Sequence, residues 1–550
     1  MLKTKYQRLM LVIFATLLTV APSITQAAAS IEKPGIQTKV EEEKAPENIQ
    51  KQDVPEVQTG KGQTFAVGKI SLKSDDIKLG DYSSLLAKYE NRSVSIDELN
   101  ELCVLITKDL RSNGYPAAAV YVPKQSFAMG SDMSLAVEPG RYGEISVDNQ
   151  SDLPDDIAEG YLAGLKRGKI IKSIELETAM QKLVGIGGIQ ASVMLSAGKE
   201  TGTTDLVVKI QKGKTATEIL YAENYGTVSA GRYRYGLQGN VQFPKIAGTL
   251  NYALVISNGG QHNYNIGYSQ YVGRSATRLG LNLSSSDYEL GGVYRALGAQ
   301  GKAYTLALSG TTPVYKSWRD SLDFSYGYAY RALEDEQETY GVDMKKHTHS
   351  FYAGVDGTIR RGKSTFNYGL THTLGTLHFD NDWANYIYGP SNTEGTYNKT
   401  NLNASYLYAF DHCFDVQLRY TAQLAYQNLD GSEEITLGGI NGVRAYPTGI
   451  GSGDEGYLAN LELRYHTKVP GLTFSTYLDC GHVKVTHDTD SLSYGGETAK
   501  GWGIGVSYTK PSDYFVRLDY ARRIGGLSYY TNDKDAKANG RIWFMLGKVF

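Results

Sequence analysis

Residues 232–243 read RYRYGLQGNVQF, and this stretch alternates between polar and apolar side chains with a period of two. The apolar face of an extended chain here carries Tyr235, Leu237, Val241 and Phe243, and the opposite face carries Arg232, Arg234, Gln238, Asn240 and Gln242. Successive side chains of a β-strand point to opposite sides. One side of this segment therefore suits lipid and the other suits water, which is typical of a strand in a transmembrane barrel.

The same alternation returns along the C-terminal part of the chain, at residues 250–256, 322–330 and 514–520. Only seven of the 42 tyrosines precede residue 215, and amphipathic aromatic rings favour the two membrane–water boundaries. A soluble β-sandwich or solenoid also has alternating strands. The number of outward tyrosines, over many strands, favours a closed barrel, in which no sheet edge is left unpaired inside hydrocarbon.

Residues 214–550 are therefore predicted to form an all-β transmembrane barrel of antiparallel strands. A membrane strand takes roughly ten residues, so with turns and surface loops this length accommodates fourteen, sixteen or eighteen strands. The chain stops at Phe550, after Ile542, Phe544 and Leu546 on one face, although Lys548 interrupts that face.

The first residues predict export. Lys3, Lys5 and Arg8 precede an apolar run at 9–20 and small residues at 21–29, so residues 1–28 are predicted to be a secretory signal peptide. No later segment has the ~20 consecutive apolar residues that a membrane-spanning helix needs. Residues 29–62 are rich in Glu, Lys, Gln and Pro and are predicted to be a flexible linker without a stable plug helix.

Two α+β units are predicted between this linker and the barrel, at residues 63–140 and 141–213. In the first unit, Ser95 and Glu98 form a capping box that opens a helix, and Asn113-Gly114 ends it. Its strands are expected at 69–72, 118–122 and 134–137. The second unit repeats the order, with a helix around 174–183 and strands near residues 145–147, 190–195 and 205–210. Each unit is expected to have a βααββ arrangement of about seventy residues.

Composition and the remaining motifs argue against several other functions. A net charge of −2 does not favour nucleic acid as a partner, and three cysteines cannot form a disulfide framework. His347, His349 and His372 lack Cys or carboxylate partners at ligand spacing, so no metal site is expected. No helix follows the glycines at 449–453, which excludes a nucleotide loop. The chain is predicted not to be an enzyme and to need no cofactor.

Two short segments near the C-terminus carry a family resemblance. Residues 438–465 read GGINGVRAYPTGIGSGDEGYLANLELRY, and residues 477–481 read YLDCG. Val443-Arg444-Ala445-Tyr446 resembles the VRGY motif of the Omp85 superfamily, with Ala445 in place of the usual glycine. The neighbouring positions resemble the ShlB/FhaC-like branch, the TpsB transporters of two-partner secretion; they are Gly438, Gly439, Asp454, Gly456, Glu462, Asp479 and Gly481.

This resemblance implies a sixteen-stranded barrel. The segments Gly114-Tyr115, Pro123-x-Gln125 and Gly202-x-Thr204-Asp205-Leu206 resemble POTRA domains of TpsB proteins, so the two α+β units are expected to be POTRA domains. The resemblance also implies that the loop bearing Arg444 folds back into the lumen, where Arg444 pairs with Asp479, and Glu462 on the following strand is expected to be a second partner. Tyr477 stands where the family strand motif has phenylalanine. The alternative from the residues alone is that Arg444 is an exposed loop cation, which would contribute little stability.

The function implied is that of a translocator in the outer membrane, with its POTRA domains in the periplasm. It would capture an unfolded exported partner, a TpsA-like exoprotein such as a β-helical adhesin or cytolysin, and secrete it through the barrel. Other expected partners are outer-membrane lipids and the barrel assembly machinery, for which Phe550 would be part of the signal. The alternatives are an Omp85-type barrel-assembly insertase, which normally has more POTRA repeats, and a passive porin, which has none.

Overall fold

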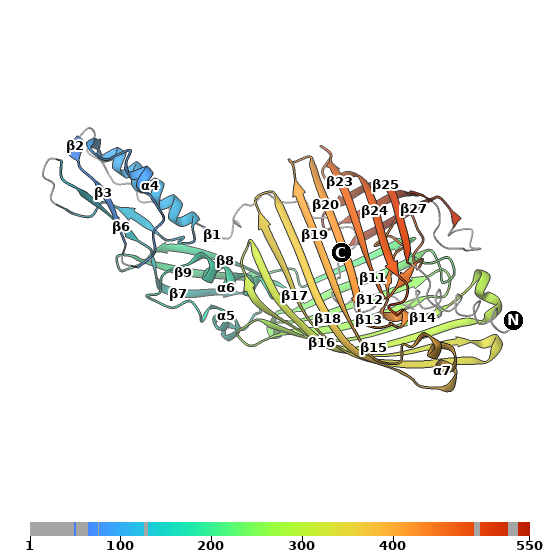
Figure 1. Cartoon of the computed structure of the whole chain (residues 1–550). Helices are drawn as coiled ribbons and strands as arrows, with labels where there is room; N and C mark the ends of the chain where they lie inside the picture. The colour runs from blue at the N-terminus through green and yellow to red at the C-terminus, as the bar shows by residue number, and fades with distance from the viewer. Residues whose placement is uncertain (1–48, 51–63, 75, 126–129, 489–495, 526–536) are drawn as a thin grey trace.

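The computed structural model describes residues 49–50, 64–74, 76–125, 130–488, 496–525 and 537–550. Two small α+β units lead into a large barrel of long, oblique strands (Figure 1). The predicted signal peptide lies outside the described residues, as does most of the predicted linker.

The first α+β unit is built on one long helix, α4 (Ile96–Ser112). The Ser95 hydroxyl accepts a hydrogen bond from the Glu98 backbone N–H at 3.1 Å, and the Glu98 carboxylate accepts one from the Ser95 backbone N–H at 2.7 Å, so the predicted capping box is confirmed. The helix packs on a sheet of order β3-β6-β5, beside a β2-β4 pair. The other elements are β2 (Thr64–Val67), β3 (Ile70–Lys73), α3 (Ser83–Leu86), β4 (Arg92–Ser95), β5 (Ala119–Tyr121) and β6 (Met133–Glu138).

The β2-β4 pair is a difference from the predicted βααββ order of this unit. Strand β4 has four residues, which is too short for a period of two to stand out in the sequence. Val94 in this strand is fully buried in the core of the unit, and antiparallel pairing with β2 holds the segment extended.

The second unit has the predicted βααββ order and a sheet of order β1-β8-β9-β7. Its elements are β7 (Arg141–Gln150), α5 (Asp155–Leu162), α6 (Ser173–Gly185), β8 (Ile189–Ala197) and β9 (Thr203–Lys212). Strand β1 (Ile49–Gln50) belongs to the predicted linker but pairs in parallel with β8. At these two residues the prediction of an unstructured linker is wrong, because the edge of β8 offers free backbone groups for pairing.

The second unit rests directly on the barrel. Thr178 of α6 donates a hydrogen bond to the Lys316 carbonyl at 2.7 Å, and the Trp318 backbone N–H donates one to Glu177 at 3.4 Å. Ala247 and Ala276, in two turns between barrel strands, are buried in the hydrophobic core of this unit. We therefore refer to this end of the barrel as the proximal end and to the opposite end as the distal end.

Among the described residues, sixteen antiparallel strands close into a barrel, which confirms the prediction. Each strand pairs with its neighbours in chain order, and the last pairs with the first. The strands are β10 (Ala216–Glu223), β11 (Arg234–Phe243), β12 (Gly248–Ser257), β13 (His262–Val272), β14 (Thr277–Glu289), β15 (Ala299–Lys316), β16 (Asp320–Gln337), β17 (Val342–Arg361), β18 (Ser364–Phe379), β19 (Gly395–Ala409), β20 (Phe414–Ala425), β23 (Glu455–His466), β24 (Leu472–Lys484), β25 (Glu497–Lys510), β26 (Tyr514–Arg523) and β27 (Gly540–Val549).

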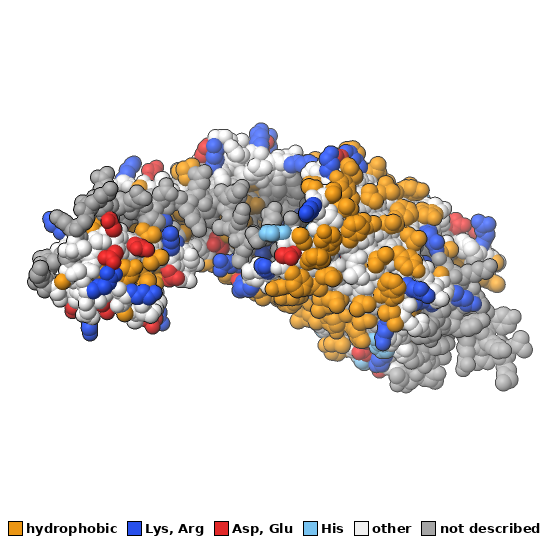
Figure 2. All heavy atoms as spheres, turned by 90° about the horizontal axis from the view of Figure 1, so that it is seen from above, with side chains coloured by type: hydrophobic (Ala, Val, Ile, Leu, Met, Phe, Trp, Pro, Cys, Tyr) orange, Lys and Arg blue, Asp and Glu red, His pale blue; other side chains and the backbone are white. Residues whose placement is uncertain are grey.

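The outer face of the barrel is apolar and the lumenal face is polar, as the alternation predicts. Figure 2 shows hydrophobic side chains covering much of the outer face. Large side chains exposed there include Tyr235, Ile266, Leu281, Leu308, Phe324, Phe351, Leu374, Leu418, Leu461, Leu478, Ile504, Leu518 and Leu546.

None of the helices in the described part of the chain has the length and hydropathy of a membrane-spanning helix.

The longest fully described connection in the barrel, residues 426–454, joins β20 to β23 at the distal end. It contains η5 (Gly431–Glu433) and the short pair β21 (Ile435–Thr436) and β22 (Ser452–Gly453). We call it the pore loop, since its side chains contact lumenal residues of the wall. The other connections contain η1 (Pro244–Ile246), η2 (Gly292–Leu297), η3 (Glu338–Tyr340), α7 (Asp382–Tyr388) and η4 (Gly389–Ser391).

Candidate functional site

The tip of the pore loop, residues 438–449, turns sharply so that its backbone packs on itself. A Cβ atom at Gly438 would lie 2.3 Å from the Pro447 carbonyl, and Gly439 has a φ of 108°, so both positions require glycine. Ala445 is not among the described residues with positive φ, and it is buried. The alanine that replaces the usual family glycine therefore fits without backbone strain.

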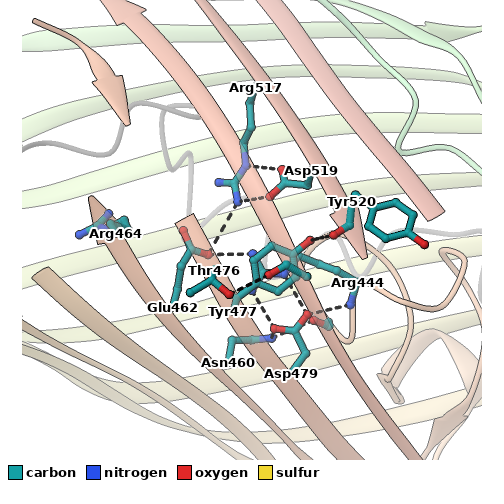
Figure 3. A network of polar contacts seen from close by, with 12 residues as sticks. Arg444, Asn460, Glu462, Arg464, Thr476, Tyr477, Asp479, Arg517, Asp519 and Tyr520 are labelled. Atoms are coloured by element: carbon teal, nitrogen blue, oxygen red, sulfur yellow. Dashed lines mark hydrogen bonds and ion pairs between the residues drawn. The ribbon is translucent and has the colours of Figure 1, made fainter. Parts of the chain in front are cut away.

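Arg444 lies at the centre of a buried cluster on the lumenal wall (Figure 3). Its guanidinium donates two hydrogen bonds to the Asp479 carboxylate, from Nε to Oδ2 at 2.9 Å and from Nη2 to Oδ1 at 2.8 Å. A third, from Nη1 to Glu462 Oε2, measures 2.7 Å. The Arg444 backbone N–H also donates to Asp479 Oδ2 at 3.1 Å. The structure thus brings together the three charged residues singled out from the sequence.

The strand register explains why these side chains meet. Asp479 pairs with Asn460, and Tyr477 pairs with Glu462, on neighbouring β23 and β24, so all four point into the lumen. Asn460 Nδ2 donates to Asp479 Oδ1 at 2.9 Å and to the Gly442 carbonyl at 2.9 Å. The Tyr477 ring lies under the guanidinium, with its centroid 3.2 Å from Arg444 Cζ, which is a cation–π contact. We call this group of residues the tip clasp.

Further charges continue the cluster along the wall. Arg517 on β26 lies 3.8 Å from Glu462, and its Nε donates to Asp519 at 2.6 Å. Burial alone would lower the pKa of Arg444, but the hydrogen bonds and charge of Asp479, with Glu462, raise that pKa above its ordinary value. Arg444 therefore remains charged, and the geometry of a bidentate arginine–carboxylate pair fixes the orientation of the loop tip.

The base of the pore loop is held by a second set of buried ion pairs, which the sequence motifs did not reveal. Asp430 accepts a hydrogen bond from Lys346 Nζ of β17 at 2.7 Å. Glu433 binds Arg331 of β16 at 3.0 Å and Lys399 of β19 at 2.8 Å. We call this group the base clamp. The only signal in the sequence was a charged residue at a lumen-facing position of each strand.

Electrostatics in the base clamp favours the ionised carboxylates. Burial alone would raise the pKa of Asp430, but the charge and hydrogen bond of Lys346 lower it below its ordinary value. For Glu433, burial again acts to raise the pKa, and the charges of Lys399 and Arg331 lower it. Lys346 Nζ also lies 4.0 Å from the ring centroid of Tyr388 in α7, so the clamp extends to the neighbouring loop.

The remaining predicted residues support the pore loop from nearby. Asp454, which is buried, accepts hydrogen bonds from the backbone N–H groups of Leu429 at 3.1 Å and His487 at 2.7 Å. Burial raises its pKa to about 6. A Cβ atom at Gly481 would lie 2.9 Å from the side chain of Leu437, so this glycine leaves room for the loop. Val443 and Tyr446 are buried in one hydrophobic cluster with Leu437. Gly456 lies at the start of β23.

Two other predictions concern residues outside the pore loop, namely Phe550 and the histidines His347, His349 and His372. Phe550 is exposed just after β27, and its backbone N–H donates a hydrogen bond to the Glu218 carbonyl at 2.8 Å. In the described residues, no group of three His, Cys, Asp or Glu side chains has the arrangement of a metal site.

Comparison with known families gives two matches. The model described as "Haemolysin secretion/activation protein ShlB/FhaC/HecB" matches residues 202–508. The model of the ShlB-type POTRA domain matches residues 65–140, which is the first α+β unit.

Individual proteins are also similar to this chain. The heme/hemopexin transporter protein HuxB of Haemophilus influenzae is 25% identical over 497 residues, which cover 87% of this chain and 85% of HuxB. Among solved structures, CdiB from Escherichia coli has a TM-score of 0.67 at 19% identity, covering 90% of this chain and 93% of CdiB. CdiB from Acinetobacter baumannii has a TM-score of 0.63 at 15% identity, and the match covers 98% of this chain and 99% of that protein. At these identities the structural likeness concerns the fold.

Proposed function

The chain belongs to the ShlB/FhaC/HecB family of haemolysin secretion/activation proteins, which are outer-membrane transporters of two-partner secretion, and from this premise we propose how it works. It is a translocator with its POTRA end in the periplasm, so the proximal end is periplasmic and the distal end extracellular. We propose that an exported partner protein arrives unfolded, is captured by the N-terminal units and passes outward through the barrel. This transport needs no catalysis, cofactor or nucleotide.

The tip clasp is the observation that best supports this proposal. A buried arginine held by two carboxylates keeps the pore loop inside the lumen, so the loop has one defined closed position. A passive porin needs a permanently water-filled channel, which such a loop would obstruct. An insertase is not favoured, because the family model that matches the barrel is that of secretion proteins.

Capture by strand addition is supported by the second unit. On the side away from β9, strand β8 pairs in the described part of the chain with two residues of β1, at Ile49↔Val193 and Gln50↔Met194. The rest of this edge can accept an extended segment through main-chain hydrogen bonds, which give affinity with modest side-chain selectivity. An unfolded polypeptide is the partner that such an edge fits.

The partner itself is proposed to be a β-helical adhesin or cytolysin whose folding outside the cell gives direction to transport. Phe550, exposed after the last strand, would be read by the barrel assembly machinery, and the apolar outer face would contact outer-membrane lipids.

Deletion of the periplasmic units tests the proposal. A variant without residues 63–213 should assemble a folded barrel but lose secretion of the exported partner protein. A smaller deletion, residues 63–140, is the matched control for barrel integrity, because it keeps the contacts of α6 with Lys316 and Trp318. Heat-modifiable gel mobility would report the folded barrel. Secretion at the wild-type level by both variants would exclude a receptor role for these units.

A further inference from the structure

The barrel seam, where β10 meets β27, is its weakest pairing. The register runs only from Ile219↔Val549 to Glu223↔Met545, shorter than any other neighbouring pair among the described barrel strands. One backbone hydrogen bond extends it toward the extracellular side, from the Asn224 N–H to the Phe544 carbonyl at 3.3 Å. Beyond that point β27 continues to Gly540, but β10 has ended.

Side chains replace the missing backbone partners at the extracellular end of the seam. Asn224 Oδ1 accepts a hydrogen bond from the Phe544 backbone N–H at 2.8 Å, and its Nδ2 donates one to the Ile542 carbonyl at 2.9 Å. An amide side chain can thus satisfy strand backbone groups that lack a neighbour.

The pore loop reaches the same place and contacts both sides of the seam. Trp543 Nε1, on β27, donates a hydrogen bond to the Arg444 carbonyl at 2.7 Å, and this contact is buried. Thr448 Oγ1 donates to the carbonyl of Tyr225, two residues after β10, at 2.8 Å. The Tyr225 and Trp543 rings meet edge to face with centroids 5.9 Å apart, and Ile440 of the loop packs against the same cluster.

We propose that the pore loop staples the barrel seam, with Trp543 and Thr448 as the positioning residues. The guanidinium of Arg444 is held by β23 and β24, while its carbonyl is held by β27. One residue therefore couples the tip clasp to the seam. A loop that leaves the lumen to let a polypeptide pass removes both contacts at once, so release of the pore loop also loosens the extracellular end of the seam.

The inference rests on the proposed role of the loop in closing the pore, but its readout is independent of secretion. Hydrogen–deuterium exchange of the full-length protein, without any partner, measures how often the backbone bonds of each strand open. Trp543→Phe keeps a ring and removes only the donor, and Thr448→Val removes only the hydroxyl. Loss of one buried hydrogen bond should raise the opening equilibrium roughly two- to tenfold.

The expected result is faster exchange in β10 and at the extracellular end of β27 in both variants, with β12, β13 and β14 unchanged. Arg444→Ala should speed exchange at the seam too, although its guanidinium is hydrogen-bonded to β23 and β24 rather than to a seam strand. The matched control is Trp502→Phe, because Trp502 lies on the outer face of β25. Wild-type exchange at the seam in Trp543→Phe and Arg444→Ala would overturn the inference, and so would an equal increase in all strands.

Discussion

The tip and the base of the pore loop are both held by buried ion pairs, but with opposite polarity. At the tip the loop provides one cation, Arg444, and the wall provides the carboxylates of Asp479 and Glu462. At the base the loop provides two carboxylates, and the wall provides Arg331, Lys346 and Lys399. Either end placed at the other site would meet like charge, so the loop has one orientation across the lumen.

The two attachment sites lie on different parts of the wall. The base is held by β16, β17 and β19, and the tip is held by β23, β24 and β27. In the order of the sixteen strands around the barrel, β16 lies about half-way round from β27. Buried ion pairs add little net stability because both partners must be desolvated, but removal of one partner leaves a buried charge without compensation. The comparison therefore predicts that single substitutions at either end loosen the loop strongly.

Arg444→Ala should have the largest effect, because it leaves Asp479 and Glu462 buried without their common cation. Breaking a buried pair in this way costs about 3–5 kcal/mol. Secretion, normalised to barrel abundance, should fall at least tenfold, while the barrel still assembles through its own backbone hydrogen bonds.

The double variant provides the check on Arg444. Asp479→Ala should give a similar defect, and combining the two substitutions should add little, because both remove the same interaction. Wild-type secretion by both single variants, or defects that multiply in the double variant, would show that these residues do not act as a pair.

Glu433→Ala should loosen the base of the loop, with a somewhat smaller cost of about 2–3 kcal/mol. Lys399 keeps a hydrogen bond to the Glu433 carbonyl at 2.8 Å, and Arg331 keeps one to the Ser432 carbonyl at 3.4 Å. Frequent openings in planar-bilayer recordings would report the loosened loop. Glu433→Gln retains the acceptor without the charge and should lie between wild type and alanine. Recordings of Glu433→Ala identical to wild type would mean that the base clamp does not restrain the loop.

The difference between the two ends also explains what the sequence could predict. The barrel followed from alternation in strands of eight to twenty residues, and the tip clasp followed from two recognisable segments around Arg444 and Asp479. The base clamp has no such segments. Its residues come from three strands and one loop, and each is a single charge whose partner is fixed only by the closed barrel register.

Short elements were hidden for a related reason. Strands β1 and β4 have two and four residues, so their pairing depends on a neighbouring edge or core rather than on a repeated pattern. The contact of Trp543 with the pore loop could not be predicted from the sequence either. Its indole N–H binds a carbonyl 99 positions away, so no local sequence pattern marks the pair.

Asp454→Asn should identify the part of the loop base that responds to pH. Burial raises the pKa of Asp454 from 3.8 to about 6, so the folded state binds the proton more tightly than the unfolded chain does. The resulting stabilisation is fully present below pH 3.8 and is lost as pH rises to about 6. The contribution of Asp454 to the free energy of unfolding should therefore fall by roughly 1–3 kcal/mol between these two pH values.

Thermal unfolding of both proteins between pH 4 and pH 7 would measure this contribution. The wild type should lose stability relative to Asp454→Asn as the pH rises through that range. The comparison ends at pH 7 because burial and the charge of Asp454 raise the pKa of Glu434 to about 8, so this neighbouring carboxyl also titrates at higher pH. Parallel curves for the two proteins would show that Asp454 does not titrate there. The carboxylates of Asp430 and Glu433 are common to both proteins, so they cancel in the comparison.

Tyr477→Phe should have the smallest effect and would separate the two roles of this side chain in the tip clasp. The hydroxyl donates a single hydrogen bond to the Tyr520 carbonyl at 3.3 Å, whereas the ring lies against the Arg444 guanidinium. Phenylalanine keeps the ring, so the loss should be under about 1 kcal/mol and secretion should stay within twofold of wild type. Tyr477→Ala removes the ring as well and should approach the defect of Arg444→Ala. If phenylalanine proved as harmful as alanine, the hydroxyl rather than the cation–π contact would be what holds the tip.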